Sequence, residues 1–214
     1  HNPTGVDYAP AEWDRIVAAL ADGAVLPIVD LAYQGLGMGM EEDAYGARAV
    51  LAGVAEALIA YSCDKNFGLY RDRVGALYWQ GADADAAARI MSNGHALARA
   101  NWSMPPDHGA AAVRLVLEDE ALTADWLAEL EGMRQRIRGV RDALAAHGTA
   151  GTLDLTPYGR QQGMFAMLPL TSAQIATLRS EHAIYMAGSG RINIAGLTPN
   201  NLDKFTDALA AITG

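Results

Sequence analysis

The sequence predicts an α/β protein with a mainly parallel sheet, joined by a long helix to a smaller α+β unit. In the first half of the chain, short apolar segments alternate with helical patterns, which is typical of a parallel sheet. A long run of apolar side chains then steps by three or four residues from Leu127 to Leu144. After Gly148 the pattern changes to short strands and helices, which indicates a separate compact unit.

The chain begins with a predicted helix and a predicted strand. Four apolar side chains fall on one helical face: Trp13, Ile16, Val17 and Leu20. Pro10 lies near the start of this helix, where proline is tolerated. Residues 25–29 follow as a buried strand that ends at Asp30, although Pro27 within it cannot donate to a strand ladder.

Further alternation is expected before the long helix. We expect strands over 58–61 and 73–79, and helices over 47–57, 83–101 and 107–117. Ligands of parallel sheets sit beyond the carboxyl ends of the strands. Asp30 and residues 62–65 both fall at that edge, so a binding site is expected there.

The last part of the chain is predicted to be a small α+β unit. Gly148 is placed to end the long helix, and Thr198-Pro199 suits the start of a final helix. Between these two points we expect strands over 164–168, 184–186 and 191–194, and a helix over 172–180. The domain boundary is placed inside the long helix, giving domains 1–130 and 131–214.

Composition excludes several classes of protein. The net charge is −9 and the pI is near 4.9, which argues against a nucleic-acid partner, and no apolar run is long enough to span a membrane. Four arginines lie mostly off the apolar stripe of the long helix and predict a solvated face: Arg134, Arg136, Arg138 and Arg141. Cys63 is the only cysteine, so no internal disulfide is possible and a cytoplasmic location fits. No metal site is expected.

One loop carries the strongest chemical signal. Lys65 follows a buried strand, where an amine is a candidate Schiff-base nucleophile. Ser62 and Arg73 lie on either side of it and suit an anionic group such as a phosphate. A ligand with both a carbonyl and a phosphate indicates pyridoxal phosphate.

Five motifs occur in a characteristic order. They are HNPTG at 1–5, DLAYQG at 30–35, YSCDKNFGLYRDR at 61–73, ARANWS at 98–103 followed by Pro105-Pro106, and SGRIN at 189–193. Together they resemble the aspartate/aromatic-amino-acid aminotransferases, class I enzymes of the fold-type-I pyridoxal-phosphate group. Members of that family carry a long N-terminal half before HNPTG, so we expect this chain to be a C-terminal portion that begins within the large cofactor-binding domain.

The resemblance implies a role for each cofactor-binding residue. Lys65 holds the cofactor covalently and then moves a proton between substrate and cofactor. Asp30 is a buried carboxylate that pairs with the pyridine nitrogen and keeps the ring protonated, so that the ring can accept electrons. Tyr33 and Asn2 donate hydrogen bonds to the ring oxygen. Ser62 and Arg73 bind the phosphate.

The resemblance also implies how substrates are bound. Arg191 holds the substrate α-carboxylate through two parallel hydrogen bonds. Arg99 binds the distal carboxylate of dicarboxylic substrates and is delivered from the neighbouring subunit, which implies a homodimer with shared active sites. A helix-end role for Arg99, beside the C-terminal dipole, stays open.

Two positions depart from the family pattern. Asp64 stands where the family usually has a small hydroxyl residue, and its carboxylate should repel a phosphate unless it pairs with Arg73 or points away. Met104 stands where many aspartate-preferring members have Asn. The Trp-Ser-Met-Pro-Pro run at 102–106 is closer to the aromatic branch.

The expected function is transamination between an aromatic or aspartate-like amino acid and 2-oxoglutarate, by a ping-pong mechanism. Two anion-binding arginines favour it because 2-oxoglutarate carries two carboxylates. Two alternatives remain at this point. One is another fold-type-I reaction, catalysed by a decarboxylase or a lyase. The other is a catalytically incompetent fragment that acts only as a folded or dimerising domain.

Overall fold

The computed structural model describes all residues from 1 to 214. The chain divides into two compact units. The sheet unit comprises Tyr8–Gly35 and Gly39–Leu130, and the C-terminal unit comprises His1–Asp7, Leu36–Met38 and Glu131–Gly214. The division along the main part of the chain falls inside the longest helix, α5. No helix combines the length and apolarity needed to cross a membrane.

The sheet unit alternates helices and strands. In chain order its elements are α1 (Pro10–Leu20), β1 (Ile28–Leu31), the short 3₁₀ helix η1 (Glu42–Ala44), α2 (Tyr45–Gly53), β2 (Ala57–Ser62), β3 (Gly75–Gln80), α3 (Ala84–Trp102), α4 (His108–Glu118) and the start of α5 (Glu120–His147). The predicted helices and strands of this half are therefore present. β1 begins only after Pro27 and contains no buried residue, so the prediction of a buried strand over 25–29 is wrong in both its start and its burial. α2 ends at Gly53, shorter than predicted, because the chain extends again at Val54 before it enters β2.

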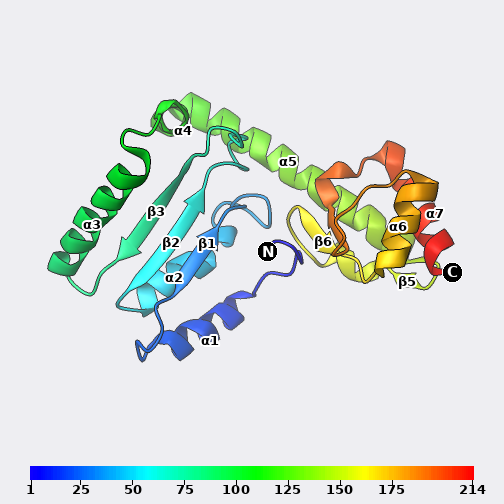
Figure 1. Cartoon of the computed structure of the whole chain (residues 1–214), viewed down its shortest axis with the longest axis horizontal. Coiled ribbons are helices and arrows are strands. Elements are labelled where there is room, and N and C mark those ends of the chain that lie inside the picture. The colour runs from blue at the N-terminus through cyan, green and yellow to red at the C-terminus, as the bar shows by residue number, and fades with distance from the viewer. The chain divides into compact units, whose positions relative to one another are not determined.

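A three-stranded sheet with β2 at its centre organises this unit (Figure 1). β1 and β2 run parallel, with Ile28 opposite Leu58 and Leu31 opposite Tyr61. β3 runs antiparallel to β2, which the sequence did not predict. The parallel pair places the carboxyl ends of β1 and β2 at one edge of the sheet, and this edge positions the Lys65 loop.

Helices α1 and α2 pack against each other where two glycines of α2 face side chains of α1. A Cβ atom on Gly46 would lie 2.2 Å from the indole of Trp13, and one on Gly53 would lie 2.1 Å from a methyl group of Val17. Only glycine allows these helices to approach so closely. The buried core of the sheet unit continues from α2, through Val50, into β2, through Ile59.

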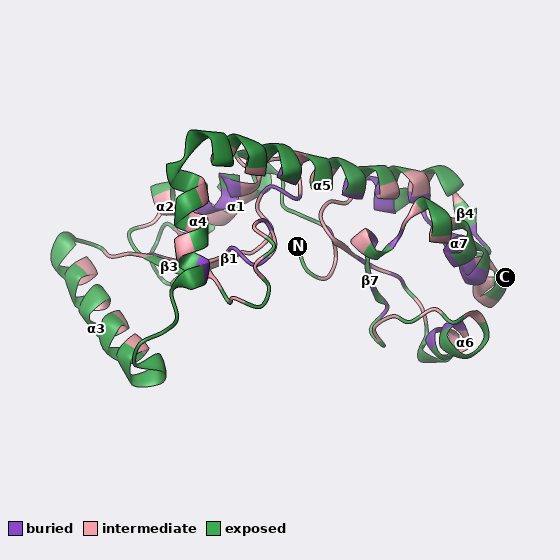
Figure 2. Ribbon diagram, turned by 90° about the horizontal axis from the view of Figure 1, so that it is seen from above, coloured by how far each residue is buried: buried purple, intermediate pink, exposed green.

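Helix α3 contrasts with α2. It packs along β3 (Figure 1), but none of its residues is buried, and Figure 2 shows the exposed colour over most of its length. Large apolar side chains on it are open to solvent, including Met91, Leu97 and Trp102.

The C-terminal unit contains the second half of α5, one small hairpin, a second antiparallel strand pair, and two helices that pack against each other. Its elements after α5 are β4 (Thr149–Ala150), β5 (Leu153–Asp154), the 3₁₀ helix η2 (Thr156–Gly159), β6 (Phe165–Met167), α6 (Ser172–His182), β7 (Arg191–Asn193), the 3₁₀ helix η3 (Ile194–Gly196) and α7 (Pro199–Thr213). β4 pairs with β5 and β6 with β7, both antiparallel. α7 is rich in buried positions (Figure 2).

The strand predicted over 184–186 is wrong. These residues form no regular element, and the first of them completes the end of α6 instead. Ala183 adopts a left-handed conformation, and the Ile184 amide then donates to the Leu178 carbonyl at 2.9 Å. This bond fixes the helix end in a Schellman-type arrangement.

The predicted solvated arginine face of α5 is also wrong at one position. Arg141 is 1% exposed, and its guanidinium donates to several backbone carbonyls: those of Tyr158, Gln162, Gly163 and Phe165. Burial lowers the pKa of Arg141 to about 10, because desolvation penalises the charged form. The side chain ties α5 to the segment that leads into β6.

Candidate functional site

The carboxyl edge of the parallel strands brings Lys65 and Tyr33 together. Tyr33 follows β1 by two residues and Lys65 follows β2 by three. The Lys65 amine lies 5.2 Å from the centroid of the Tyr33 ring, over its face, where a cation is attracted by the ring electrons. Asp30 lies within β1, opposite Ala60. Its carboxylate is exposed, so the expectation that it is buried is wrong for this chain.

Lys65 is partly shielded and touches a carboxylate. Its side chain is 21% exposed, and its Nζ lies 3.9 Å from Asp64 Oδ2. The ion pair and the aromatic face both restrain a side chain that is normally mobile. The amine is therefore held at a defined place at the sheet edge while it remains reachable by a small molecule.

Asp64 pairs with Arg73. Asp64 is 2% exposed, and its Oδ2 accepts a hydrogen bond from Arg73 Nη1. The same nitrogen donates to the Tyr70 carbonyl at 2.9 Å. Arg73 has a φ of +54°, in the left-handed region that non-glycine residues seldom adopt. Its guanidinium remains largely exposed, so it is accessible to an anion.

Ser62 and Cys63 lie where β2 passes into the loop. Ser62 Oγ accepts a hydrogen bond from the Asp64 amide at 3.2 Å, and the Cys63 amide donates to the Val74 carbonyl at 2.9 Å. The Cys63 thiol is buried. Its pKa is raised, first by desolvation and then by the negative charge of Asp64.

Sequence reasoning missed the group that anchors this loop. Asn66 is buried and donates to the Tyr61 hydroxyl at 2.9 Å, while Trp126 of α5 donates to the Asn66 carbonyl at 2.7 Å. Phe67 stacks on Trp126 with ring centroids 4.3 Å apart. Asn66 and Phe67 stand beside Lys65 in the motif and could have been singled out, but no local signal marks Trp126, which is 60 residues distant from Asn66.

Asn2 and Arg191 meet within the C-terminal unit. Arg191 Nη1 donates to Asn2 Oδ1 at 3.3 Å. The Arg191 guanidinium also lies 5.2 Å from the centroid of the Phe165 ring, on the neighbouring strand. Arg191 is exposed and forms no ion pair with a carboxylate. Its charge is therefore available to an anion from outside the chain.

Arg99 forms its hydrogen bond within its own helix end, not with the other predicted site residues. It belongs to the last turn of α3 and is exposed. Its Nη1 donates to the Ser103 carbonyl at 3.1 Å, next to the point where Ser103 takes a positive φ and ends the helix. This contact is the helix-end interaction that the sequence left open, and it leaves most of the guanidinium free.

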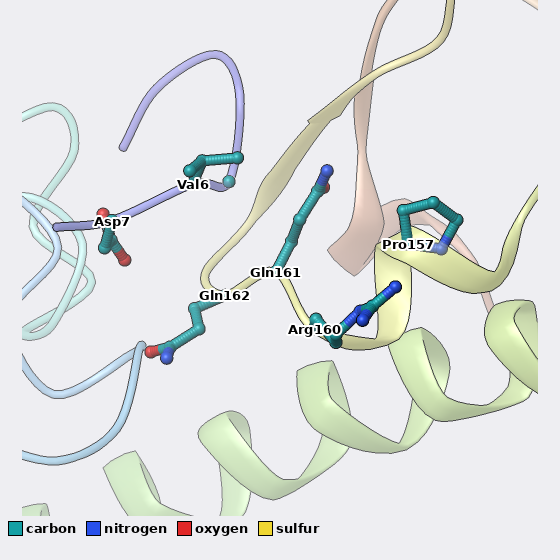
Figure 3. Close-up of a pocket in the computed structure, with 7 residues that line it drawn as sticks. Val6, Asp7, Pro157, Arg160, Gln161 and Gln162 are labelled. Carbon is teal, nitrogen blue, oxygen red and sulfur yellow. The ribbon is translucent and has the colours of Figure 1, made fainter. Parts of the chain in front are cut away.

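A pocket in the C-terminal unit contains none of the predicted site residues. It has a volume of about 280 Å³ and adjoins the turn at the start of the chain (Figure 3). Its lining residues are Gly5, Val6, Asp7, Pro157, Arg160, Gln161 and Gln162. None of these lining residues is a lysine or a cysteine.

The matches to known proteins extend over almost the whole chain. Residues 1–209 match the family model described as aminotransferase class I and II. A tyrosine aminotransferase of Rhizobium meliloti (strain 1021) is 51% identical over 197 residues, which are 92% of this chain and 51% of that protein. An aromatic-amino-acid aminotransferase of Pseudomonas aeruginosa is 44% identical over 99% of this chain and 54% of its own length.

Solved structures lead to the same family. The crystal structure of an aromatic-amino-acid aminotransferase from Burkholderia pseudomallei, covalently bound to pyridoxal phosphate, has a TM-score of 0.94 at 40% identity and covers all of this chain and 54% of that one. The chain spans about half the length of the curated relatives it matches. On the family match, the identities and the shared fold, the chain belongs to the aminotransferase class I and II family.

Proposed function

We propose that this chain carries the lysine half of a pyridoxal-phosphate-dependent aminotransferase that moves an amino group between an aromatic or aspartate-like amino acid and 2-oxoglutarate. The observation that carries the proposal is the restrained amine of Lys65. It lies 5.2 Å from the Tyr33 ring and 3.9 Å from Asp64, within a chain that belongs to a family of aminotransferases.

The residues of the sheet unit fit pyridoxal phosphate. Arg73 keeps its Nε and Nη2 free of hydrogen bonds to the protein and its guanidinium exposed, as a phosphate ligand requires. Lys65 supplies an amine for the aldehyde, and Asp30 is an exposed carboxylate at the same sheet edge. When bound, the cofactor supplies an aldehyde and a ring that accepts electrons.

Each side chain has a proposed task. With the cofactor bound, the Lys65 amine would hold its aldehyde and would carry a proton to and from the substrate carbon. Asp30 would keep the ring nitrogen protonated, and Tyr33 and Asn2 would donate to the ring oxygen. Ser62 and Arg73 orient the phosphate, although the Ser62 hydroxyl already accepts the Asp64 amide.

Substrate binding is proposed to rest on two arginines. Arg191 has no carboxylate partner within the chain, which supports a role in holding the α-carboxylate of an amino acid or a 2-oxo acid. Arg99 uses one nitrogen at its helix end and keeps the rest of its guanidinium for a distal carboxylate. In the proposed homodimer this carboxylate belongs to a substrate in the other subunit's active site.

We further propose that residues 1–130 are the C-terminal part of the large cofactor-binding domain and that 131–214 form the small domain. We also propose that the enzyme is cytoplasmic. The observed division inside α5 supports this boundary. His1–Asp7 and Leu36–Met38 nevertheless group with the C-terminal unit, so these two segments of the proposed domain 1–130 depart from the proposed division.

A single-turnover measurement tests the reaction. The chain is loaded with pyridoxal phosphate and mixed with L-tyrosine or L-aspartate, and the 2-oxo acid product is quantified. 2-Oxoglutarate is then added and glutamate is measured. We expect both products, with Lys65→Ala lowering their rates by roughly 10²–10⁴-fold because it removes the proton carrier.

Lys204→Ala is the matched control, since Lys204 lies exposed on α7 and should leave both rates unchanged. Release of carbon dioxide with an amine would indicate a decarboxylase, and release of ammonia would indicate a lyase. No product from any amino acid would show that the chain is a catalytically incompetent fragment.

A further inference from the structure

A buried carboxylate lies between the two cations of the Lys65 loop. Asp64 Oδ2 accepts from Arg73 Nη1 and lies 3.9 Å from Lys65 Nζ. The Asp64 side chain is 3% exposed, whereas that of Arg73 is 73% exposed. The Asp64 carboxylate therefore pairs with both Arg73 and Lys65, the two cations that would bind the cofactor in the proposed function.

The hydrogen bonds of Asp64 are incomplete. Its Oδ1 is buried and has no hydrogen-bond partner, which is costly for a charged group. The carboxylate therefore depends on Arg73 and Lys65 for its stabilisation, and removal of either cation leaves buried charge uncompensated. Asp64 is thus a strong intramolecular competitor for any other anion that approaches these two side chains.

Arg73 is drawn back onto its own loop by the same contact. Nη1 donates both to Asp64 and to the Tyr70 carbonyl, and the positive φ of Arg73 goes with this arrangement. A phosphate ester carries about 1.5 to 2 negative charges at neutral pH. A phosphate at Arg73 would share that guanidinium with Asp64, and two anions at one cation repel each other.

We propose that Asp64 competes with the phosphate group of the cofactor for Arg73 and so sets how tightly this site holds a phosphate ester. The identity of the cofactor rests on the proposed function, but the competition for Arg73 does not. In the cofactor-free chain, the Asp64 carboxylate occupies Arg73, the arginine proposed to bind the phosphate. This contact weakens the binding of the cofactor.

The first test uses inorganic phosphate and isothermal titration calorimetry. Asp64→Asn keeps the shape of the side chain and removes its charge. We expect Asp64→Asn to bind phosphate about tenfold more tightly than the unmodified chain, the effect of losing one competing charge-assisted hydrogen bond. This gain should disappear when Asp64→Asn is combined with Arg73→Met.

Asp72→Asn is the matched control. Asp72 belongs to the same loop and is adjacent to Arg73, but it bonds His108 Nε2 at 2.7 Å. A general effect of loop charge would strengthen phosphate binding in both variants, whereas competition for Arg73 strengthens it in Asp64→Asn alone. The proposal is overturned if Asp64→Asn binds phosphate no more tightly, if Asp72→Asn gains equally, or if the gain survives without Arg73.

The second test compares pyridoxal phosphate with pyridoxal, which lacks the phosphate, by equilibrium dialysis. Asp64→Asn should raise the preference for the phosphorylated form about tenfold, and an unchanged preference contradicts the proposal. Borohydride reduction of the same samples reports separately on the proposed function. If no adduct forms on Lys65 while the phosphate result holds, the proposed function fails and the role of Asp64 stands.

Discussion

Lys65 lies between a carboxylate and an aromatic ring, and both neighbours come from the ends of adjacent strands. Asp64 precedes it in the loop after β2, and Tyr33 follows β1. Parallel pairing brings these two strand ends together, so the place of the amine is a direct consequence of the register between β1 and β2. A restrained, partly exposed amine is what covalent capture of an aldehyde needs.

Cys63, two residues before Lys65, should be an inert thiol in the native chain. It is buried and its pKa is raised, and the thiolate is the reactive form. We expect iodoacetamide at pH 8 to label the native chain at least about tenfold more slowly than the chain in urea, as followed by intact mass. Equal rates would show that this thiol is open to solvent.

The raised pKa also fixes the sign of a pH effect. The unfolded thiol has the ordinary pKa of 9.0, and the folded thiol keeps its proton to a higher pH. Above pH 9 the folded chain therefore binds more protons at this position than the unfolded chain does. The contribution of Cys63 to stability is therefore complete below pH 9 and declines as the pH rises toward the folded-state pKa. Cys63→Ala should remove this part of the alkaline loss of stability in urea titrations.

At the scale of the elements, the α1–α2 contact depends on glycine. A methyl group at Gly46 would overlap the Trp13 indole, so Gly46→Ala should lower the free energy of unfolding by about 1–3 kcal/mol. Gly139 of α5 is the control, because nothing lies within 4 Å of its Cβ position. Gly139→Ala should raise stability by about 0.5–1 kcal/mol, as measured by urea denaturation. Equal effects of the two changes would show that α1 does not pack here.

Helix α5 is held to the segment before β6 by Arg141. Arg141→Met removes the donors that satisfy four backbone carbonyls, so it should destabilise the chain by about 3 kcal/mol or more. Arg138→Ala breaks only an exposed pair with Asp142 and should cost less than about 1 kcal/mol. Urea denaturation midpoints would compare the two, and a similar loss in both would contradict the role given to Arg141.

The elements that the sequence predicts well are those specified by local chemistry. Pro10 and the apolar stripe predict α1, and Thr198-Pro199 predicts the start of α7. What the sequence did not predict depends on contacts between distant residues. The antiparallel direction of β3 is set by its pairing with β2, and the burial of Arg141 depends on carbonyls 17–24 positions later. Residues 184–186 form no strand, and the amide of Ile184 bonds the Leu178 carbonyl at the end of α6 instead.

At the scale of the whole molecule, the predicted site residues fall into two groups. Two residues, Asn2 and Arg191, belong to the C-terminal unit, where they contact each other. The others belong to the sheet unit: Asp30, Tyr33, Ser62, Lys65, Arg73 and Arg99. The order of the motifs along the chain predicted the family, but periodicity could not predict that Asp64 would be buried and paired with Arg73. That pairing depends on a loop conformation in which Arg73 takes a positive φ.

The most direct test of the whole account is the site at which the chain captures pyridoxal phosphate. Lys65 and Lys204 are the lysines of the chain, so each serves as the control for the other. After incubation with the cofactor and borohydride reduction, peptide mass mapping should place the added mass on Lys65 and leave Lys204 unmodified. Equal labelling of both lysines, labelling of Lys204 alone, or no labelling would contradict the central claim that Lys65 is the amine built to receive the cofactor.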